Sequence, residues 1–168
     1  MNIYRGCQHQ CIYCDSRSEC YQIENFADIL IKTNAIELLE RELKSKRTIG
    51  TIGTGSMNDP YMPLEASLCL TRRALELIAQ AGFPVHTITK SDLVLRDLDL
   101  LRVIARRSAL HVNLSVTTLD RRLAEGLEPR APTPTRRLRA VRSLAAEGIE
   151  AGVFLMPVLP GLTDVLVE

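Results

Sequence analysis

The feature that most constrains the fold of this chain is a regular alternation of short apolar runs with longer amphipathic segments. Four apolar runs have the length of one buried strand each: residues 48–53, 84–89, 111–117 and 151–156. Three segments with helical spacing separate them: a helix of about 64–81 that Gly82 ends, a helix that Ser91 or Asp92 caps, and a helix that runs from Thr133 and Pro134 to Gly148. This alternation predicts βα units, with a parallel sheet and helices outside it.

The N-terminal part fits the alternation less regularly. We expect residues 2–4 to serve as a first strand, and a helix of about 35–45 to begin after Asn34. Residues 27–32 form either an extra edge strand or a segment on the sheet surface. No linker divides the sequence, so we expect one domain over residues 1–168. Because the sheet looks cut at both ends, we also expect it to be a fragment of a longer protein, without the start of the first strand and the last βα unit.

Apolar positions in the last helix predict which of its faces is buried. Leu138, Val141, Leu144 and Ala145 recur at helical spacing there, so we expect them on the core face. The arginines of the same helix then face solvent. Residues 96–142 carry eleven arginines against five acidic residues. They form either solvated helix faces or a basic rim that meets the phosphates of a nucleic acid.

The apolar runs bear on the compartment as well. The longest of them, such as residues 151–159, are interrupted by Gly or Pro and fall short of the roughly 20 residues of a membrane helix. Asn2, Tyr4 and Arg5 break any apolar core that a signal peptide would need. We therefore expect a cytoplasmic protein without a membrane partner.

Three closely spaced cysteines, Cys7, Cys11 and Cys14, predict a metal loop. The chain has five cysteines, an odd number, and four of them lie near its start, which suits metal binding better than a disulfide framework. A [4Fe–4S] cluster normally takes four thiolates, so a group of three suggests a cluster with one open iron. The alternative is a zinc knuckle completed by His9 or Cys20, although zinc ligands usually come as two separate pairs.

Polar residues follow each predicted strand. They are the cysteine loop after residues 2–4, residues 53–61 after the second strand, Lys90 and Ser91 after the third, Ser115 and Thr117 at the end of the fourth, and Met156 and Pro157 after the fifth. Ligands of parallel βα folds bind at the carboxyl ends of the strands. We expect these residues to meet around the metal.

The cysteine loop, with Tyr13 just before the third cysteine, resembles the Cys-x3-Cys-x2-Cys motif of the radical S-adenosylmethionine superfamily. The resemblance implies a [4Fe–4S] cluster whose open iron binds S-adenosylmethionine, and an enzyme that cleaves this cofactor reductively to a 5′-deoxyadenosyl radical. That radical would abstract hydrogen from a substrate. It also implies an electron donor such as ferredoxin or flavodoxin.

Residues 4–14, 58–65, 128–132 and 157–164 more narrowly resemble the group related to spore photoproduct lyase, also called DNA repair photolyase-like proteins. That resemblance implies a partial (β/α)6 barrel, of which this chain holds about five strands. It also points to a nucleic-acid-related substrate. The lyase has a hydrogen-donating cysteine after its second strand, whereas residues 55–59 here contain no thiol. DNA-lesion repair is therefore not implied.

Carried over by position, the resemblance assigns the cluster to Cys7, Cys11 and Cys14 and the cofactor to seven further residues: Tyr13, Gly53, Gly55, Asn58, Lys90, Ser115 and Thr117. The glycines would let the backbone approach the cofactor, Asn58 would lie near its methionyl end, and Lys90 would pair with its carboxylate. Ser115 and Thr117 would bind its ribose or carboxylate. Each residue also has an ordinary structural explanation, as a turn glycine, a turn initiator, a surface lysine or a plain strand residue.

Several neighbouring residues receive supporting roles. We expect Glu128 and Arg130 to buttress each other or to reach the cofactor or substrate, and Tyr4 and Arg5 to screen the cluster from solvent. His9 would donate a hydrogen bond within the cysteine loop, whereas Cys20 and Cys69 would take no part. The alternative function is a non-enzymatic zinc or iron–sulfur module that binds nucleic acid through its arginine-rich half.

Overall fold

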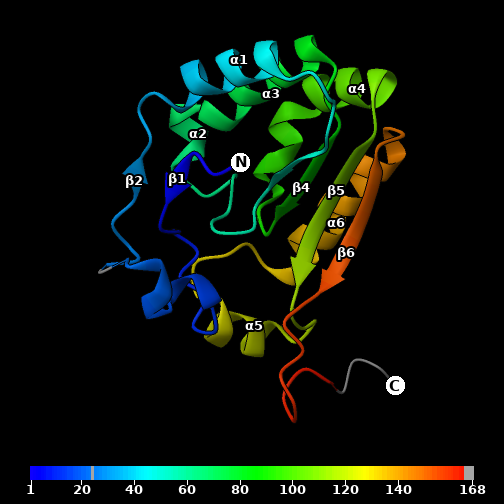
Figure 1. Cartoon of the computed structure of the whole chain (residues 1–168). Coiled ribbons are helices and arrows are strands. Elements are labelled where there is room, and N and C mark those ends of the chain that lie inside the picture. Colours follow the sequence, from blue (N-terminus) through cyan, green and yellow to red (C-terminus); the bar gives the residue numbers. More distant parts are fainter. Residues whose placement is uncertain (24, 165–168) are drawn as a thin grey trace.

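The computed structural model describes residues 1–23 and 25–164, which form an open parallel sheet with helices against one face (Figure 1). The sheet has the order β3-β4-β5-β6, and all three neighbouring pairs are parallel. Its strands are β3 (Ile52–Thr54), β4 (Val85–Thr89), β5 (Leu110–Val116) and β6 (Glu150–Leu155). The predicted fold class is confirmed, and the four strands form a curved part of a barrel rather than a closed one.

Helices connect the strands as the periodicity predicts. They are α1 (Ala35–Ser45), α2 (Glu65–Leu68), α3 (Leu70–Ala81), α4 (Leu98–Arg107), α5 (Arg121–Leu127) and α6 (Pro134–Ala146). Ser91 caps a 3-10 helix, Asp92–Asp97, that leads into α4, and its hydroxyl accepts the Leu93 N–H at 3.2 Å. The predicted helix over 64–81 is interrupted at Cys69, whose φ of 53° is left-handed, so α2 and α3 are separate. Helix α5 was not predicted.

The core lies between the sheet and helices α3, α4 and α6. Val85, Val112 and Leu114 point from the strands into it, and Ile104 and Leu144 meet them from α4 and α6. Because successive strand residues point to opposite faces, the other face carries residues 86 and 88 of β4 and 111, 113 and 115 of β5. Among the described residues, no helix combines the length and the apolar character needed to cross a membrane.

The first strand differs from the prediction. Strand β1 (Tyr4–Arg5) does not join the parallel sheet but pairs antiparallel with β2 (Leu30–Ile31) in a separate two-stranded sheet, so residues 27–32 supply a strand that is not an edge strand of the main sheet. Further hydrogen bonds occupy its neighbourhood: Lys32 N–H donates to the Ile3 carbonyl at 3.0 Å, and the Asn58 amide donates to the Tyr4 carbonyl. These hydrogen bonds take the place of the backbone pairing between residues 2–4 and β3 that the alternation predicted.

The last helix also differs in which residues face the core. Leu138 is 39% exposed, whereas Arg137 is 1% exposed. Helix α6 is thus rotated so that Arg137, Ala140 and Leu144 point inward. The apolar pattern predicted the wrong face because it could not show that Arg137 has a buried partner. The carboxylate of Glu128 lies 2.5 Å from the guanidinium of Arg137 and compensates its charge.

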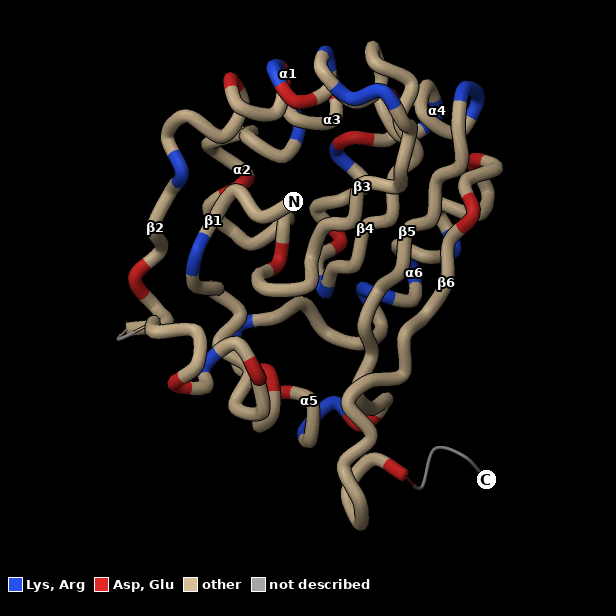
Figure 2. Tube along the Cα trace, viewed as in Figure 1, with Lys and Arg blue, Asp and Glu red and all other residues tan. Residues whose placement is uncertain are grey.

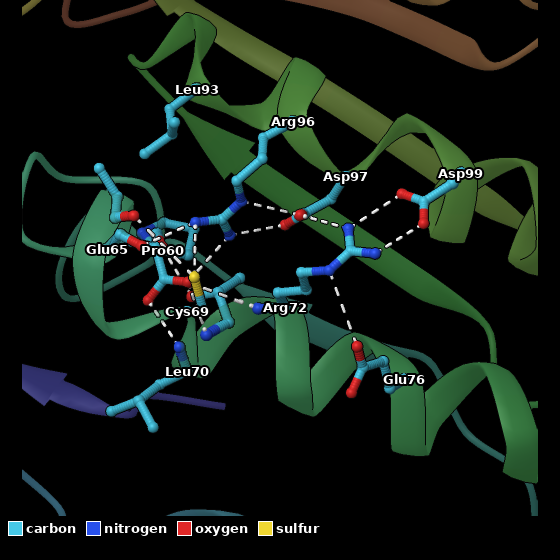
Figure 3. Close-up of polar contacts among 12 residues, drawn as sticks. Pro60, Glu65, Cys69, Leu70, Arg72, Glu76, Leu93, Arg96, Asp97 and Asp99 are labelled. Atoms are coloured by element: carbon cyan, nitrogen blue, oxygen red, sulfur yellow. Dashed lines mark hydrogen bonds and ion pairs between the residues drawn. The ribbon is translucent and has the colours of Figure 1, made fainter.

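A buried ionic cluster joins α2, α3 and the segment before α4 (Figure 3). Glu65, with no exposed surface, accepts hydrogen bonds from the N–H groups of Leu70 and Thr71 at 3.1 and 3.0 Å and from the Tyr4 hydroxyl. Its carboxylate therefore caps α3 in place of the residue before that helix, Cys69, whose side chain gives no cap. Arg96 lies 3.0 Å from Glu65 and 2.9 Å from Asp97, and Arg72 lies 3.0 Å from Asp97, so each buried carboxylate of the cluster has an arginine partner.

Candidate functional site

A cavity of about 430 Å³ lies at the carboxyl ends of the strands, between the cysteine loop and the sheet. Eight of the ten predicted site residues line it: Cys7, Cys11, Tyr13, Cys14, Gly55, Asn58, Lys90 and Ser115. Met156 and Pro157 also line it, as their place after the last strand suggests. A second cavity, of about 520 Å³, lies between α1 and β3 and contains no predicted site residue.

The cysteine loop is anchored by backbone hydrogen bonds to distant segments. Cys7 N–H donates to the Phe26 carbonyl at 3.2 Å, Ile12 N–H to the Leu127 carbonyl at 2.9 Å, and Arg130 N–H to the His9 carbonyl at 3.3 Å. Gly6 permits the first of these contacts, because its φ is +89° and a Cβ there would lie 2.8 Å from the Phe26 oxygen. The loop is therefore held from both sides of the site.

The three thiols differ in exposure. Cys7 and Cys11 are buried and Cys14 is half-buried. Burial, and then the charge of Asp59, raises the pKa of the Cys7 thiol to about 12, and burial also raises the pKa of Cys11. Burial therefore disfavours the thiolate form at both positions.

Within residues 1–23 and 25–164, no three His, Cys, Asp or Glu side chains converge so as to hold a single metal ion. A cluster does not require such convergence, because each of its thiolates binds a different iron. A single zinc ion would require it.

Asp59 connects the cysteine loop to the end of β4. Its Oδ1 accepts the Thr89 hydroxyl at 2.6 Å and the Tyr61 N–H at 2.8 Å, and its Oδ2 accepts the Lys90 N–H at 2.6 Å. His9 Nε2 lies 3.1 Å from Oδ2, although not aligned as a hydrogen bond, and His9 Nδ1 lies 3.3 Å from the Arg130 carbonyl. Burial alone would raise the pKa of Asp59, but His9 and these hydrogen bonds lower it to about 2.

Glu128 forms a second connection beside the cavity. Its Oε1 accepts the Thr117 hydroxyl at 2.8 Å and the Tyr13 hydroxyl, while its Oε2 pairs with Arg137. Burial would raise the pKa of Glu128, but Arg137, then Tyr13 and Lys90, lower it, so the carboxylate stays charged. The expected contact between Glu128 and Arg130 is absent among the described residues. Arg130 is exposed, and the buried partner is Arg137.

Lys90 is the cation closest to the cavity. Its Nζ lies 3.9 Å from Glu128 Oε1, beyond hydrogen-bonding distance, and 5.7 Å from the centre of the Tyr13 ring. Among the described residues its ammonium donates no hydrogen bond, and only 19% of its side chain is exposed. A half-buried ammonium with unused donors is suited to bind a ligand carboxylate.

Of the remaining residues given a role from the sequence, some line the cavity and others lie away from it. Asn58 lines the cavity, but its amide is engaged with the Tyr4 carbonyl. Gly53 and Thr117 do not line the cavity. Tyr4 is buried against Glu65 rather than placed over the cysteine loop, and Arg5 donates to the carbonyls of Tyr21 and Gln22.

Of the two cysteines expected to take no part, Cys20 is exposed and Cys69 lies beside Arg96. Sequence reasoning did not identify Asp59 as more than part of a turn, nor Arg137 as a residue near the site. The available signal for Asp59 was its place, before Pro60, in the loop that follows a strand.

Gly55 is required by packing against the neighbouring strand. Its φ is +93°, and a Cβ would lie 1.9 Å from the Ile88 carbonyl oxygen, whereas a Cβ at Gly53 would meet nothing within 4 Å. We expect Gly55→Ala to lower the free energy of unfolding by at least about 2 kcal/mol and Gly53→Ala to change it by less than about 1 kcal/mol. Urea denaturation of both variants measures the difference, and equal losses would contradict it.

The arginines of residues 96–142 do not form one basic rim. Five of them pair with carboxylates: Arg96, Arg102, Arg121, Arg136 and Arg137. Figure 2 shows Lys and Arg at both ends of the sheet, interspersed with Asp and Glu. This distribution favours solvated helix faces over a phosphate-binding surface.

Sequence comparison finds relatives across the whole chain. Residues 1–168 match the family described as the Radical SAM superfamily. The chain is 34% identical over 168 residues to an uncharacterized protein of Methanocaldococcus jannaschii, covering 98% of this chain and 62% of that protein. It is 32% identical over 171 residues to an uncharacterized protein of Mycobacterium tuberculosis, covering 98% of this chain and 50% of that one. The chain thus spans between half and two thirds of these relatives' length.

Two further matches carry functional names. The radical SAM Nalpha-GlyT isomerase of Pseudomonas phage M6 is 23% identical over 156 residues, covering 93% of this chain and 32% of that protein. Spore photoproduct lyase complexed with dinucleoside spore photoproduct superposes with a TM-score of 0.73 and 18% identity, over 94% of this chain and 45% of that one. The superposition shows that the two share a fold.

Proposed function

The chain belongs to the radical S-adenosylmethionine superfamily, and from that membership we propose that Cys7, Cys11 and Cys14 hold a [4Fe–4S] cluster with one iron left for S-adenosylmethionine. When bound, the two groups would supply an electron and a sulfonium, whose reductive cleavage gives methionine and a 5′-deoxyadenosyl radical. The donor set fits this use, because three thiols line one cavity and two of them are buried.

The observation that carries the proposal is the meeting of three thiols and an ammonium with unused donors in one cavity. Lys90 would bind the cofactor's carboxylate, and Ser115, buried at the end of β5, would offer a hydroxyl to its polar groups. Asp59 would fix the backbone of Lys90 through the bond to its N–H, and the surrounding strands would limit access of water. The electron donor would be a protein such as ferredoxin or flavodoxin.

For the substrate we propose a nucleic-acid-related molecule. One match supports this class by name: the solved spore photoproduct lyase is complexed with a dinucleoside spore photoproduct. Residues 55–59 offer no thiol as a hydrogen donor. The proposed reaction is therefore hydrogen abstraction without a cysteine on this loop.

Anaerobic reconstitution followed by an assay for 5′-deoxyadenosine tests the proposal. We expect about four irons and four sulfides per chain and release of 5′-deoxyadenosine only when S-adenosylmethionine and a reductant are both present. A fully loaded cluster that never cleaves the cofactor would contradict the enzyme. One zinc per chain, without iron, would favour the non-enzymatic module instead.

A further inference from the structure

Thr117 occupies an unexpected position for a residue predicted to touch the cofactor. It is buried and does not line the cavity. Its hydroxyl contacts Glu128 Oε1 at 2.8 Å, the Met156 carbonyl at 3.1 Å and the Tyr13 hydroxyl at 2.9 Å. Any influence of Thr117 on a ligand in the cavity must therefore pass through these partners.

The partner that matters is Glu128, because its carboxylate lies next to Lys90. Oε2 is paired with Arg137 at 2.5 Å, and Oε1 accepts two hydroxyls, from Thr117 and Tyr13. A carboxylate oxygen has about two lone-pair positions, so both on Oε1 are taken. This explains why Lys90, at 3.9 Å, is attracted to Glu128 without a hydrogen bond to it.

Arg137 keeps this arrangement in place from the far side. It is 1% exposed, and its other nitrogens donate to the Pro132 carbonyl at 2.8 Å and the Ser115 carbonyl at 2.9 Å. Glu128 therefore cannot turn toward Lys90 without breaking a buried ion pair, which is costly. Of the two oxygens, only Oε1 can reach the lysine, and only when a hydroxyl leaves it.

We propose that Thr117 is a positioning residue that occupies Glu128 Oε1 and so keeps the ammonium of Lys90 available to the carboxylate of S-adenosylmethionine. The inference rests on the proposed function above and deepens it, because it explains how a lysine beside a buried carboxylate stays open to an anionic ligand. Without the Thr117 hydroxyl, Oε1 gains a free lone pair and competes with the ligand for Lys90.

A double-mutant cycle on the anaerobically reconstituted full chain tests the proposal, with the dissociation constant of S-adenosylmethionine as the readout. We expect Thr117→Val to raise that constant about tenfold while iron and sulfide content stay at the wild-type level. Thr117→Ser keeps the hydroxyl and should keep the affinity. Thr135→Val, an exposed position of α6, is the matched control and should change nothing.

The same substitution is then made in two backgrounds, Lys90→Met and Glu128→Gln. In the first no ammonium can be captured, and in the second an uncharged amide replaces the competing carboxylate, so Thr117→Val should have little effect in either. Titrations to millimolar ligand cover the weaker affinity of Lys90→Met. If Glu128→Gln does not fold, the Lys90→Met background decides.

Two results would overturn the inference. An unchanged affinity in Thr117→Val would mean that its hydroxyl does not keep Lys90 free, and an equal loss in all backgrounds would mean that Thr117 touches the ligand directly. Both leave the proposed function intact, since the wild-type protein still binds and cleaves S-adenosylmethionine. A wild-type protein with a full cluster and no affinity for S-adenosylmethionine would instead refute the proposed function and this inference with it.

Discussion

Replacing Cys11 with alanine is expected to abolish the release of 5′-deoxyadenosine and to lower the iron bound after reconstitution. The same holds for Cys7→Ala and Cys14→Ala, because each thiol would hold a different iron and, among the described residues, no other thiol lines the cavity. We expect a fall in activity of at least about a hundredfold, since loss of even an outer partner of a metal site costs tenfold to a hundredfold. Iron, sulfide and 5′-deoxyadenosine are measured on each purified variant.

The chain contains its own matched controls for this experiment. Cys20 is exposed and Cys69 lies at the start of α3, and neither lines the cavity. Cys20→Ala and Cys69→Ala should therefore retain iron and activity close to the wild-type values. If Cys20→Ala lost as much iron as Cys11→Ala, Cys20 would have to be a ligand, and the prediction of an open iron would be wrong.

The second large effect is expected in stability rather than in activity. Replacing Glu65 with alanine should lower the free energy of unfolding by about 3–5 kcal/mol, because it removes one partner from a buried ionic cluster. Arg96 would lose the carboxylate at 3.0 Å, and Leu70 and Thr71 would lose the acceptor of their N–H groups (Figure 3). Urea denaturation of the protein without metal, followed by circular dichroism, measures this change.

Glu76→Ala is the control for Glu65→Ala. Glu76 lies on the same helix as the capped residues and pairs with Arg72 at 3.7 Å, but 45% of its side chain is exposed. Exposed pairs of this kind contribute about 0–1 kcal/mol, so the loss should stay within that range. If both variants lost the same amount, burial of the cluster around Glu65 would not be the source of its contribution.

The sequence predicted the alternating strands and helices because they follow from apolar spacing. It was less informative where a tertiary partner decides the structure. The charge of Arg137 suggested an exposed helix face, and only the approach of Glu128 makes its burial favourable. Helix α5 was missed because it is short and contains Gly126, although Asp120, which accepts the Leu123 N–H at 3.0 Å, was a readable cap.

The candidate site, too, could be predicted only in part from the sequence. The place of each polar residue after a strand predicted which side chains would gather, and eight of the ten line the cavity. Their hydrogen-bond partners could not be predicted, because these come from remote parts of the chain. Gly55 illustrates the difference: its place in the loop suggested contact with a cofactor, whereas the carbonyl of Ile88 on the adjacent strand excludes any side chain there.

The anchoring of the cysteine loop has a consequence for the order of events during protein synthesis. Tyr13 and its partner Glu128 are 115 residues apart in the sequence, and the loop backbone also needs Leu127 and Arg130. At about 5–20 residues per second, a ribosome takes roughly ten seconds to make the intervening chain. The three thiols thus emerge well before the segments that complete their folded surroundings. A nascent chain in that interval presents reactive, unprotected cysteines, so exclusion of oxidants matters before cluster insertion as well as after it.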